Sequence, residues 1–133
     1  MEVTRAKEVK RLLKEAKELA IAQKAPMTTT GHLLEAMLTD DQTEVAQFFN
    51  KMQLNRNEMV EQLHRFYPEE GEEKTIDSPR VKESLVIAAK QVEELHHAEM
   101  TSMHLLLALF MQEKTIAQAI LTAEHHEWNG CSI

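Results

Sequence analysis

Apolar residues recur along this chain at every third or fourth position, the spacing that lines one face of an α-helix. The clearest stripe consists of Val81, Leu85, Ala88, Val92 and Leu95. The small alanine in the middle of the stripe indicates that a second helix approaches closely at this point. The pattern therefore predicts an amphipathic helix that packs on the rest of the protein through this face.

A matching stripe occurs near the start of the chain. Its apolar positions are Val9, Leu13, Ala16 and Ala20. Each stripe is followed by a similar segment, TTGHLLEAM at residues 29–37 and TSMHLLLAL at residues 101–109, at an offset of 72 positions (104 minus 32 for the shared histidine). Further along, residues 45–47 align with residues 116–118 if one residue is deleted. One helical element is therefore predicted to occur twice.

Residues that cap helices stand at the expected starts of these segments. Ser78 and Pro79 form a typical start, because the hydroxyl caps a free N–H group and proline needs no N–H in the first turn. Asn55 followed by Glu58 has the form of a capping box for a fourth helix. The apolar residues of that helix are Met59, Leu63 and Phe66. The other predicted caps are Thr29 or Thr30, Thr101 or Ser102, and Asp41 for a third helix through Phe48, Phe49 and Met52.

These segments predict a single all-α domain over residues 1–133. Repeat one is expected at about residues 5–66 and repeat two at about residues 78–126. The stretch between them, residues 67–77, includes the sequence PEEGEEK without apolar periodicity, which predicts an exposed linker. After Ala123 the sequence contains no counterpart of the fourth helix, so repeat two is expected to lack it.

Composition and charge narrow the function classes. Hydrophobic residues make up 43% and charged residues 28% of the chain, as in soluble globular proteins. The net charge of −7 disfavours a nucleic-acid partner, because phosphate binding requires a basic surface. The single cysteine, Cys131, cannot form an internal disulfide and suits a reducing compartment. No signal sequence and no apolar run of about 18 residues occurs, so we expect a cytoplasmic protein without a membrane partner.

Seven histidines raise the question of a metal or catalytic site. The adjacent pairs are His96–His97 and His125–His126. Adjacent residues point in different directions on a helix, and no His-x-x-x-His spacing occurs, so we expect no metal site even though His97 and His104 flank a predicted loop. His32 and His104 occupy equivalent positions just inside helix starts, where we expect their rings to bind neighbouring backbone. No nucleophile motif is present, so we expect neither catalysis nor a cofactor.

The doubled Thr-x-x-His-Leu-Leu-x-Ala motif resembles the Clp N-terminal domain, which stands at the front of the ClpA, ClpB and ClpC unfoldases. The resemblance covers nearly the whole chain. It implies a pseudo-twofold bundle of two four-helix repeats that recruits substrates or adaptor proteins for an ATP-driven ring. The phosphate-binding pattern Gly-x-x-x-x-Gly-Lys is missing from this sequence, so this chain itself is not expected to be an ATPase.

The resemblance also bears on a ligand of the ClpC branch, phosphoarginine. In that branch a threonine begins the first helix of each repeat, and a glutamate directly precedes the motif histidine. Here the threonine positions hold Ala6 and Ser78, and the glutamate positions hold Gly31 and Met103. We therefore expect one site without polar partners, a second that keeps only the helix start at Ser78 and Pro79, and weak binding of phosphoarginine.

The remaining binding candidates include methionines. Methionine suits the binding of varied peptides because its side chain is flexible, but at helical spacing it also fills cores. We expect Met111 in the core, and both interpretations stay open for Met100 and Met103. The predicted protein-binding residues, around a groove between the repeats, are Thr30, Ser78, Arg80, Met100, Ser102 and Met103.

Three functions fit this interpretation. The first is a docking domain that binds unfolded substrates or an adaptor and delivers them to a Clp ATPase or protease ring. The second is a stand-alone accessory subunit that docks on a Clp protease ring. The third is the N-domain of a secretion-associated Clp ATPase, which binds one defined helix. A downstream ATPase module would exclude the second, and affinity for a single helix would favour the third.

Overall fold

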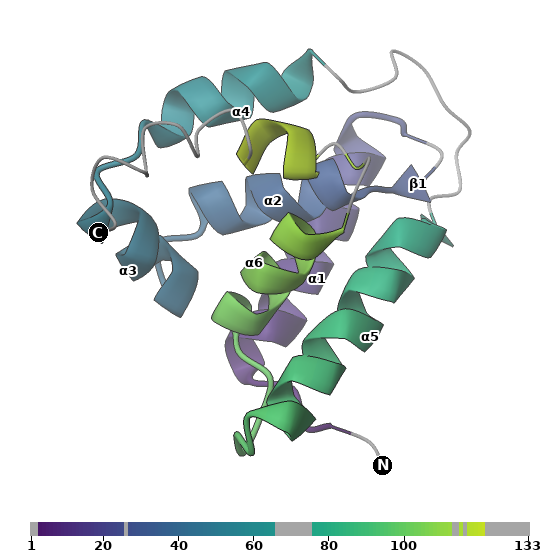
Figure 1. Ribbon diagram of the computed structural model, residues 1–133. Coiled ribbons are helices and arrows are strands. Elements are labelled where there is room, and N and C mark those ends of the chain that lie inside the picture. The colour runs from purple at the N-terminus through teal and green to yellow at the C-terminus, as the bar shows by residue number, and fades with distance from the viewer. Residues whose placement is uncertain (1–2, 26, 66–75, 113–114, 116, 122–133) are drawn as a thin grey trace.

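The computed structural model describes residues 3–25, 27–65, 76–112, 115 and 117–121 (Figure 1). Its elements in chain order are α1 (Lys7–Ala22), β1 (Met27–Thr28), α2 (Thr30–Thr39), α3 (Glu44–Lys51), α4 (Arg56–His64), β2 (Ile76–Asp77), α5 (Pro79–Glu94) and α6 (Ser102–Met111), and residues 117–121 are also helical. The predicted all-α fold is confirmed. Phe66, the PEEGEEK stretch and residues 122–133 lie outside the described residues, whereas the last two residues of the predicted linker form β2.

The two halves repeat each other at the predicted offset of 72. Helices α1 and α5 both span 16 residues, and α2 and α6 both span 10. The turn after each long helix contains a residue in the left-handed region, Lys24 with φ of 57° and His96 with φ of 56°. These two residues are themselves 72 positions apart (96 minus 24), so the repeat extends to the backbone of the turns.

The start of the third helix corrects two predictions. Thr43, not Asp41, caps α3, because its hydroxyl accepts the Ala46 N–H at 3.1 Å. Asp41 instead pairs with Arg56 at the start of α4 at 2.8 Å. In the second half Thr115 accepts the Gln118 N–H at 3.1 Å, as Thr43 does 72 positions earlier. The offset therefore continues through this turn, and the predicted one-residue deletion is wrong.

The repeats are interlocked through short parallel backbone pairings. Strand β1 pairs with β2, in the register Met27 with Ile76 and Thr28 with Asp77. At the equivalent place, Arg5 forms a single parallel bridge with Met100. The segment before each long helix thus pairs with the segment before the short helix of the other repeat. Neither pairing was predicted, because two residues carry no readable alternation of apolar and polar positions.

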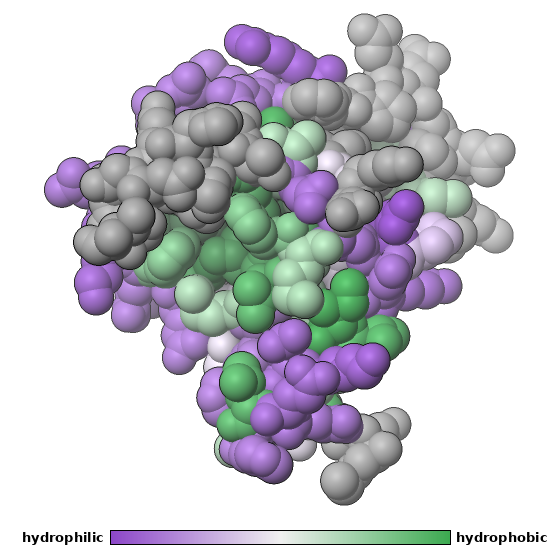
Figure 2. Space-filling view, viewed as in Figure 1, coloured by the Kyte–Doolittle hydropathy of each residue, from purple (hydrophilic) through white to green (hydrophobic). Residues whose placement is uncertain are grey.

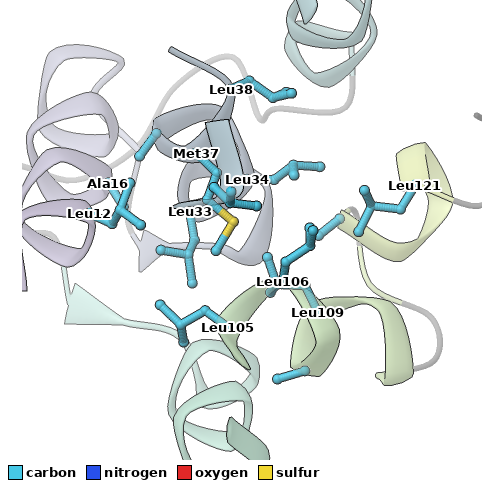
Figure 3. Close-up of a cluster of buried hydrophobic side chains, with 14 of the residues drawn as sticks. Leu12, Ala16, Leu33, Leu34, Met37, Leu38, Leu105, Leu106, Leu109 and Leu121 are labelled. Atoms are coloured by element: carbon cyan, nitrogen blue, oxygen red, sulfur yellow. The ribbon is translucent and has the colours of Figure 1, made fainter. Parts of the chain in front are cut away.

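The core lies where the two short helices meet the long helix α1. Figure 3 shows side chains from the three helices converging in one cluster. Its labelled members include Leu12 and Ala16 from α1, Leu33, Leu34 and Met37 from α2, and Leu105, Leu106 and Leu109 from α6. The mid-stripe alanines Ala16 and Ala88 are fully buried, which confirms the predicted close helix approach. None of the described helices has the length and apolar character needed to span a bilayer.

The buried faces of the long helices differ slightly from the predicted stripes. Leu12 and Ser84 are fully buried at equivalent positions, whereas Leu13 and Leu85 are only half-buried. Leu95, at the end of the predicted stripe, is 51% exposed. The hydroxyl of Ser84 tolerates burial because it donates to the Arg80 carbonyl at 2.9 Å. The buried positions therefore match the predicted stripe at Val9, Ala16, Ala20 and their equivalents, and differ from it at one position in each helix, where Leu12 and Ser84 are buried in place of Leu13 and Leu85.

Candidate functional site

Two of the predicted binding residues have buried structural roles. The Ser102 hydroxyl accepts the Val45 N–H at 3.0 Å, and the Thr30 hydroxyl accepts the Ala117 N–H at 3.4 Å. Thr30 and Ser102 are 72 positions apart, and so are Val45 and Ala117. The same bond therefore forms twice, each time joining one repeat to the other. Thr30 is 2% exposed and Ser102 is fully buried, so these hydroxyls hold the bundle together.

The other predicted binding residues are spread over different surroundings. Ser78 caps α5 by accepting the Val81 N–H at 3.3 Å, and exposed Arg80 pairs with Glu83 on the same helix. Met100 is buried in the core, and Met103 is half-buried on α6. The six residues therefore do not form one site. Met111, expected in the core, is instead 51% exposed.

A groove lies between the N-terminal segment, the start of α1 and the outer face of α5. Its volume is about 650 Å³. The lining residues are Val3, Thr4, Arg5, Lys10, Lys82, Leu85, Val86, Ala89 and Met100. Lys10 and Lys82 are pseudo-equivalent (82 minus 10 gives 72), so the groove runs along the axis that relates the repeats. The predicted docking groove was placed near Thr30, Met100, Ser102 and Met103, and of these residues only Met100 lines this groove.

The groove combines an apolar floor with a positive rim. Val86 is 66% exposed, and half-buried Leu85 and Ala89 extend its apolar surface. The charged lining residues are Arg5, Lys10 and Lys82, and none of the described residues that line the groove is acidic. This contrasts with the net charge of −7 for the chain. The sequence analysis considered methionines and did not predict these lysines as binding residues. The alignment of Lys10 with Lys82 in the repeat could have indicated them.

The two motif histidines are structural, as predicted. Each ring accepts a backbone N–H at Nδ1, from Thr29 to His32 at 3.0 Å and from Thr101 to His104 at 2.9 Å. The hydrogen on Nε2 is then free to donate, to Gln23 in the first repeat and to the His97 ring at 2.8 Å in the second. Burial, followed by the charge of a nearby histidine, lowers the pKa of His32 to about 4 and lowers the pKa of His104.

The fold brings His97 and His104 together, but only as a pair. Their ring nitrogens are 2.8 Å apart, at hydrogen-bonding distance, and a shared tetrahedral metal would hold them further apart. Within the described part of the chain, no group of three or more potential metal ligands occurs. The pair is best explained as a contact that orients the buried His104 ring.

A single carboxylate near the start of α1 binds the starts of two other helices. Glu8, in the first turn of α1, accepts the Ser102 N–H at 2.6 Å and the Glu44 N–H at 3.1 Å. It therefore caps two helices, α6 and α3, with one negative charge. From the sequence, Ala6 and Gly31 of repeat one were expected in one site. The Ala6 N–H instead donates to the Met100 carbonyl of repeat two, so each such site combines residues of both repeats.

A further carboxyl cluster lies between α1 and the end of α2. Arg11 binds Asp40 at 2.7 Å, which lowers the pKa of Asp40. Glu15 lies beside them, and its burial, together with a hydrogen bond to Asp40, raises the pKa of Glu15 to about 7. Glu15 is therefore partly protonated near neutral pH, and the Arg11–Asp40 ion pair joins α1 to the end of α2.

One protein family matches both halves of the chain. The family described as the Clp repeat (R) N-terminal domain matches residues 6–77 and again residues 76–127. These two matches correspond to the two structural repeats. No curated protein sequence gives a match.

Solved structures of similar fold come from several organisms. The N-domain of ClpV from Vibrio cholerae has a TM-score of 0.80 at 21% identity, covering 92% of this chain and 76% of that chain. The Hsp104 N-terminal domain from Candida albicans has a TM-score of 0.74 at 16% identity, covering 94% and 82%. A complex of a ClpV N-domain with a VipB peptide has a TM-score of 0.74 at 22% identity, covering 94% and 86%. At these identities the likeness establishes the fold.

Proposed function

This chain belongs to the Clp repeat N-terminal domain family, and from that membership we propose that it is a non-catalytic docking domain. Its role is to bind segments of substrate or adaptor proteins and deliver them to a Clp ATPase or protease ring in the cytoplasm. The absence of a phosphate-binding loop from the sequence supports a docking role in place of an ATPase role.

The groove on the pseudo-twofold axis carries this proposal. Its exposed Val86 and its half-buried Leu85 and Ala89 offer apolar surface to a partner segment. The rim cations Lys10 and Lys82 favour a segment that also carries acidic residues. The proposal is in keeping with a similar fold, a ClpV N-domain, having been solved in complex with a VipB peptide.

We further propose that free phosphoarginine is not the ligand. The helix start at Ala6 has no hydroxyl, and Glu8, two residues further on, adds a negative charge near this helix start. The other site keeps Ser78, but Gly31 replaces the glutamate that would hold the guanidinium. Titration calorimetry at millimolar phosphoarginine should therefore detect weak binding or none, whereas a dissociation constant near 1 μM, about 8 kcal/mol, would contradict this.

The groove proposal is tested by NMR titration with an unfolded, acidic model protein such as reduced casein. Backbone signals of α5 around Val86 and of the N-terminal segment should shift. A Val86→Glu variant should bind at least about tenfold more weakly, because it places a like charge against the acidic ligand. Gln47→Glu, an equal charge change on the exposed face of α3, is the matched control. Equal loss in both variants, or shifts confined to α3 and α4, would refute the groove.

A second candidate function is the N-domain of a secretion-associated Clp ATPase that binds one defined helix. The similarity in fold to ClpV N-domains favours it. A stand-alone accessory subunit on a protease ring is the third. Comparing affinities for a panel of unfolded proteins and of single helices separates the first two, and sequencing the parent gene beyond Ile133 separates the third.

A further inference from the structure

A second hollow continues the groove along α5. It has a volume of about 490 Å³, and Val3 and Thr4 line both the hollow and the groove. The facing wall is α5 with the turn after it, through Lys82, Leu85, Val86 and Ala89 in the groove and Glu93 and His96 in the second hollow. These positions recur at helical spacing on one face, over about 20 Å at 1.5 Å per residue. The groove and the hollow therefore form one trough along α5.

The apolar middle of the trough is not required by the fold. Val86 is exposed and Ala89 is half-buried, and the equivalent positions on α1, 72 residues earlier, hold Lys14 and Lys17. Both lysines are exposed, so repeat one keeps the same face of its long helix polar. Figure 2 shows hydrophobic residues over the middle of α5, with hydrophilic residues towards both of its ends. An apolar surface that only one repeat carries indicates a contact surface.

The two ends of the trough carry opposite charges. Arg5, Lys10 and Lys82 line it near the start of α5, and Glu93 lines it near the end. The backbone dipole adds to this difference, because a helix is positive at its start and negative at its end. Helix α5 is described along its whole length and has no acidic residue in its first turn and no basic residue in its last turn. A ligand with one acidic end and one basic end therefore complements the trough.

We propose that the trough binds a segment of a partner protein in one direction, with the acidic end of the segment at Lys10 and Lys82, its apolar centre on Val86 and Ala89, and its basic end at Glu93. This charge order rests on the proposed groove function and adds the chemistry of the partner to it. The direction follows from the charges, because complementary charges fix the register of a complex more than they raise its affinity.

The parts of this chain outside the described residues do not have this charge order. Residues 122–133 contain two glutamates but no lysine or arginine. Between residues 66 and 75 the sequence PEEGEEK places its lysine directly after the glutamates, without an apolar stretch between them. Residues 1–2, 113–114 and 116 are too few to span about 20 Å, since an extended residue covers at most about 3.6 Å. The charges of the trough therefore favour a segment of a partner protein.

Two synthetic peptides of about 14 residues, long enough to follow the trough as a helix, test the charge order. Both have a centre of leucine and alanine. One has two glutamates at its N-terminus and two lysines at its C-terminus, and the other has the reverse order. A nitroxide spin label on the acidic end broadens NMR signals of nearby protein residues. With both peptides it should broaden the backbone signals of Lys10 and Lys82 and spare Glu93, because charge and not chain direction sets the orientation.

Variants separate the apolar centre from the charged ends. Val86→Lys combined with Ala89→Lys copies the residues of α1, so the fold should tolerate it. It should bind both peptides at least about tenfold more weakly, although it adds positive charge, because apolar contact is lost. Glu93→Lys makes both ends of the trough positive, so the label on the acidic end should then broaden both ends. Glu61→Lys, an equal charge change at an exposed position of α4, is the matched control and should keep the single direction.

The groove and the charge order can fail separately. Equal binding by the double lysine variant and the wild type would refute the groove itself. Weaker binding by that variant, with both ends of the trough broadened equally in the wild type, would overturn the charge order and leave the groove standing. No binding of either peptide at ~1 mM protein would also overturn the charge order. A spin label on the single cysteine, Cys131, that broadens Val86 and Glu93 without peptide would overturn the partner segment, because the chain's own residues would then occupy the trough.

Discussion

Glu8 and Arg80 occupy the same position in the two repeats and carry opposite charges. The Glu8 carboxylate accepts backbone N–H groups from the first turns of α6 and α3, so it offsets the positive ends of both helices. The Arg80 side chain makes an exposed contact with Glu83 at 3.3 Å and no cap of this kind among the described residues. Repetition of the fold has thus preserved the backbone position while one copy acquired an internal cap.

Removing this cap should destabilise the protein measurably. We expect Glu8→Ala to lower the free energy of unfolding by about 2 kcal/mol, because hydrogen bonds to a charged group are lost at two helix ends. The matched variant Arg80→Ala should change it by less than about 0.5 kcal/mol, because its ion pair is exposed. Urea unfolding of both variants measures the difference. Similar values for the two would show that Glu8 is not the cap.

The buried His32 predicts a loss of stability in acid. The fold lowers its pKa to about 4 from the ordinary value of 6.5. Between these values the unfolded chain binds more protons than the folded chain, so stability present above pH 6.5 is lost as the pH falls. We expect a loss of about 2 kcal/mol through this residue between pH 7 and pH 5.

Urea unfolding of the wild type and of His32→Gln at both pH values tests this. The raised pKa of Glu15 acts in the opposite direction. The folded protein holds the Glu15 proton more tightly than the unfolded chain, so this contribution to stability is lost as the pH rises towards 7. That contribution is the same in both proteins and cancels in the comparison. As an independent measure, the His32 ring signals of the folded wild type should not titrate above about pH 5. Parallel pH dependence of the two proteins would contradict the prediction.

The helices are delimited by caps that repeat between the halves. Thr43 and Thr115 begin the third helices, and the N–H groups they accept lie three residues downstream. The preceding helices end alike, with Asp40 at φ of −90° and Gln112 at φ of −88°. Asp41 was a plausible cap from sequence, because aspartate and threonine both serve at this position. The backbone path decides between them, since only Thr43 has its side chain beside the free N–H.

Substitutions at these two neighbours separate the alternatives. We expect Thr43→Ala to lower the free energy of unfolding by about 1–2 kcal/mol, because the buried Ala46 N–H loses its acceptor. Asp41→Ala should change it by less than about 0.5–1 kcal/mol, because only an exposed contact with Arg56 is lost. Thermal or urea unfolding of both variants measures the ranking, and the reverse order would restore Asp41 as the cap.

The molecule as a whole is two repeats that complete each other. Backbone pairing joins β1 to β2 and Arg5 to Met100, in each case across the repeat boundary. The buried hydroxyls of Thr30 and Ser102 accept N–H groups from the opposite repeat. The short helices α2 and α6 share one core. Each repeat therefore contains polar groups whose hydrogen-bond partners belong to the other.

Neither half is expected to fold alone. A polypeptide of residues 1–75 would expose the apolar side of α2 and leave the Thr28 and Val45 backbone groups without their partners. We expect it to have little stable helix by circular dichroism, and the same for residues 76–133. Mixing the two should restore helicity and give one species of the full chain's mass by native mass spectrometry. A cooperative unfolding transition of residues 1–75 alone, as a monomer, would show that the repeats are independent.

The sequence by itself determined the helical elements and their duplication. Helix position follows from local spacing and capping, so the faces with Ala16 and Ala88, the start at Ser78 and the roles of His32 and His104 were all predictable. Contacts between distant segments leave no such local signal. The two-residue strands, the bonds across the repeats and the rim formed by Lys10 and Lys82 arise only when the repeats pack around their shared axis. The exposure of Leu107 and Met111 likewise follows from which neighbour covers each helix face, and only the tertiary structure decides that.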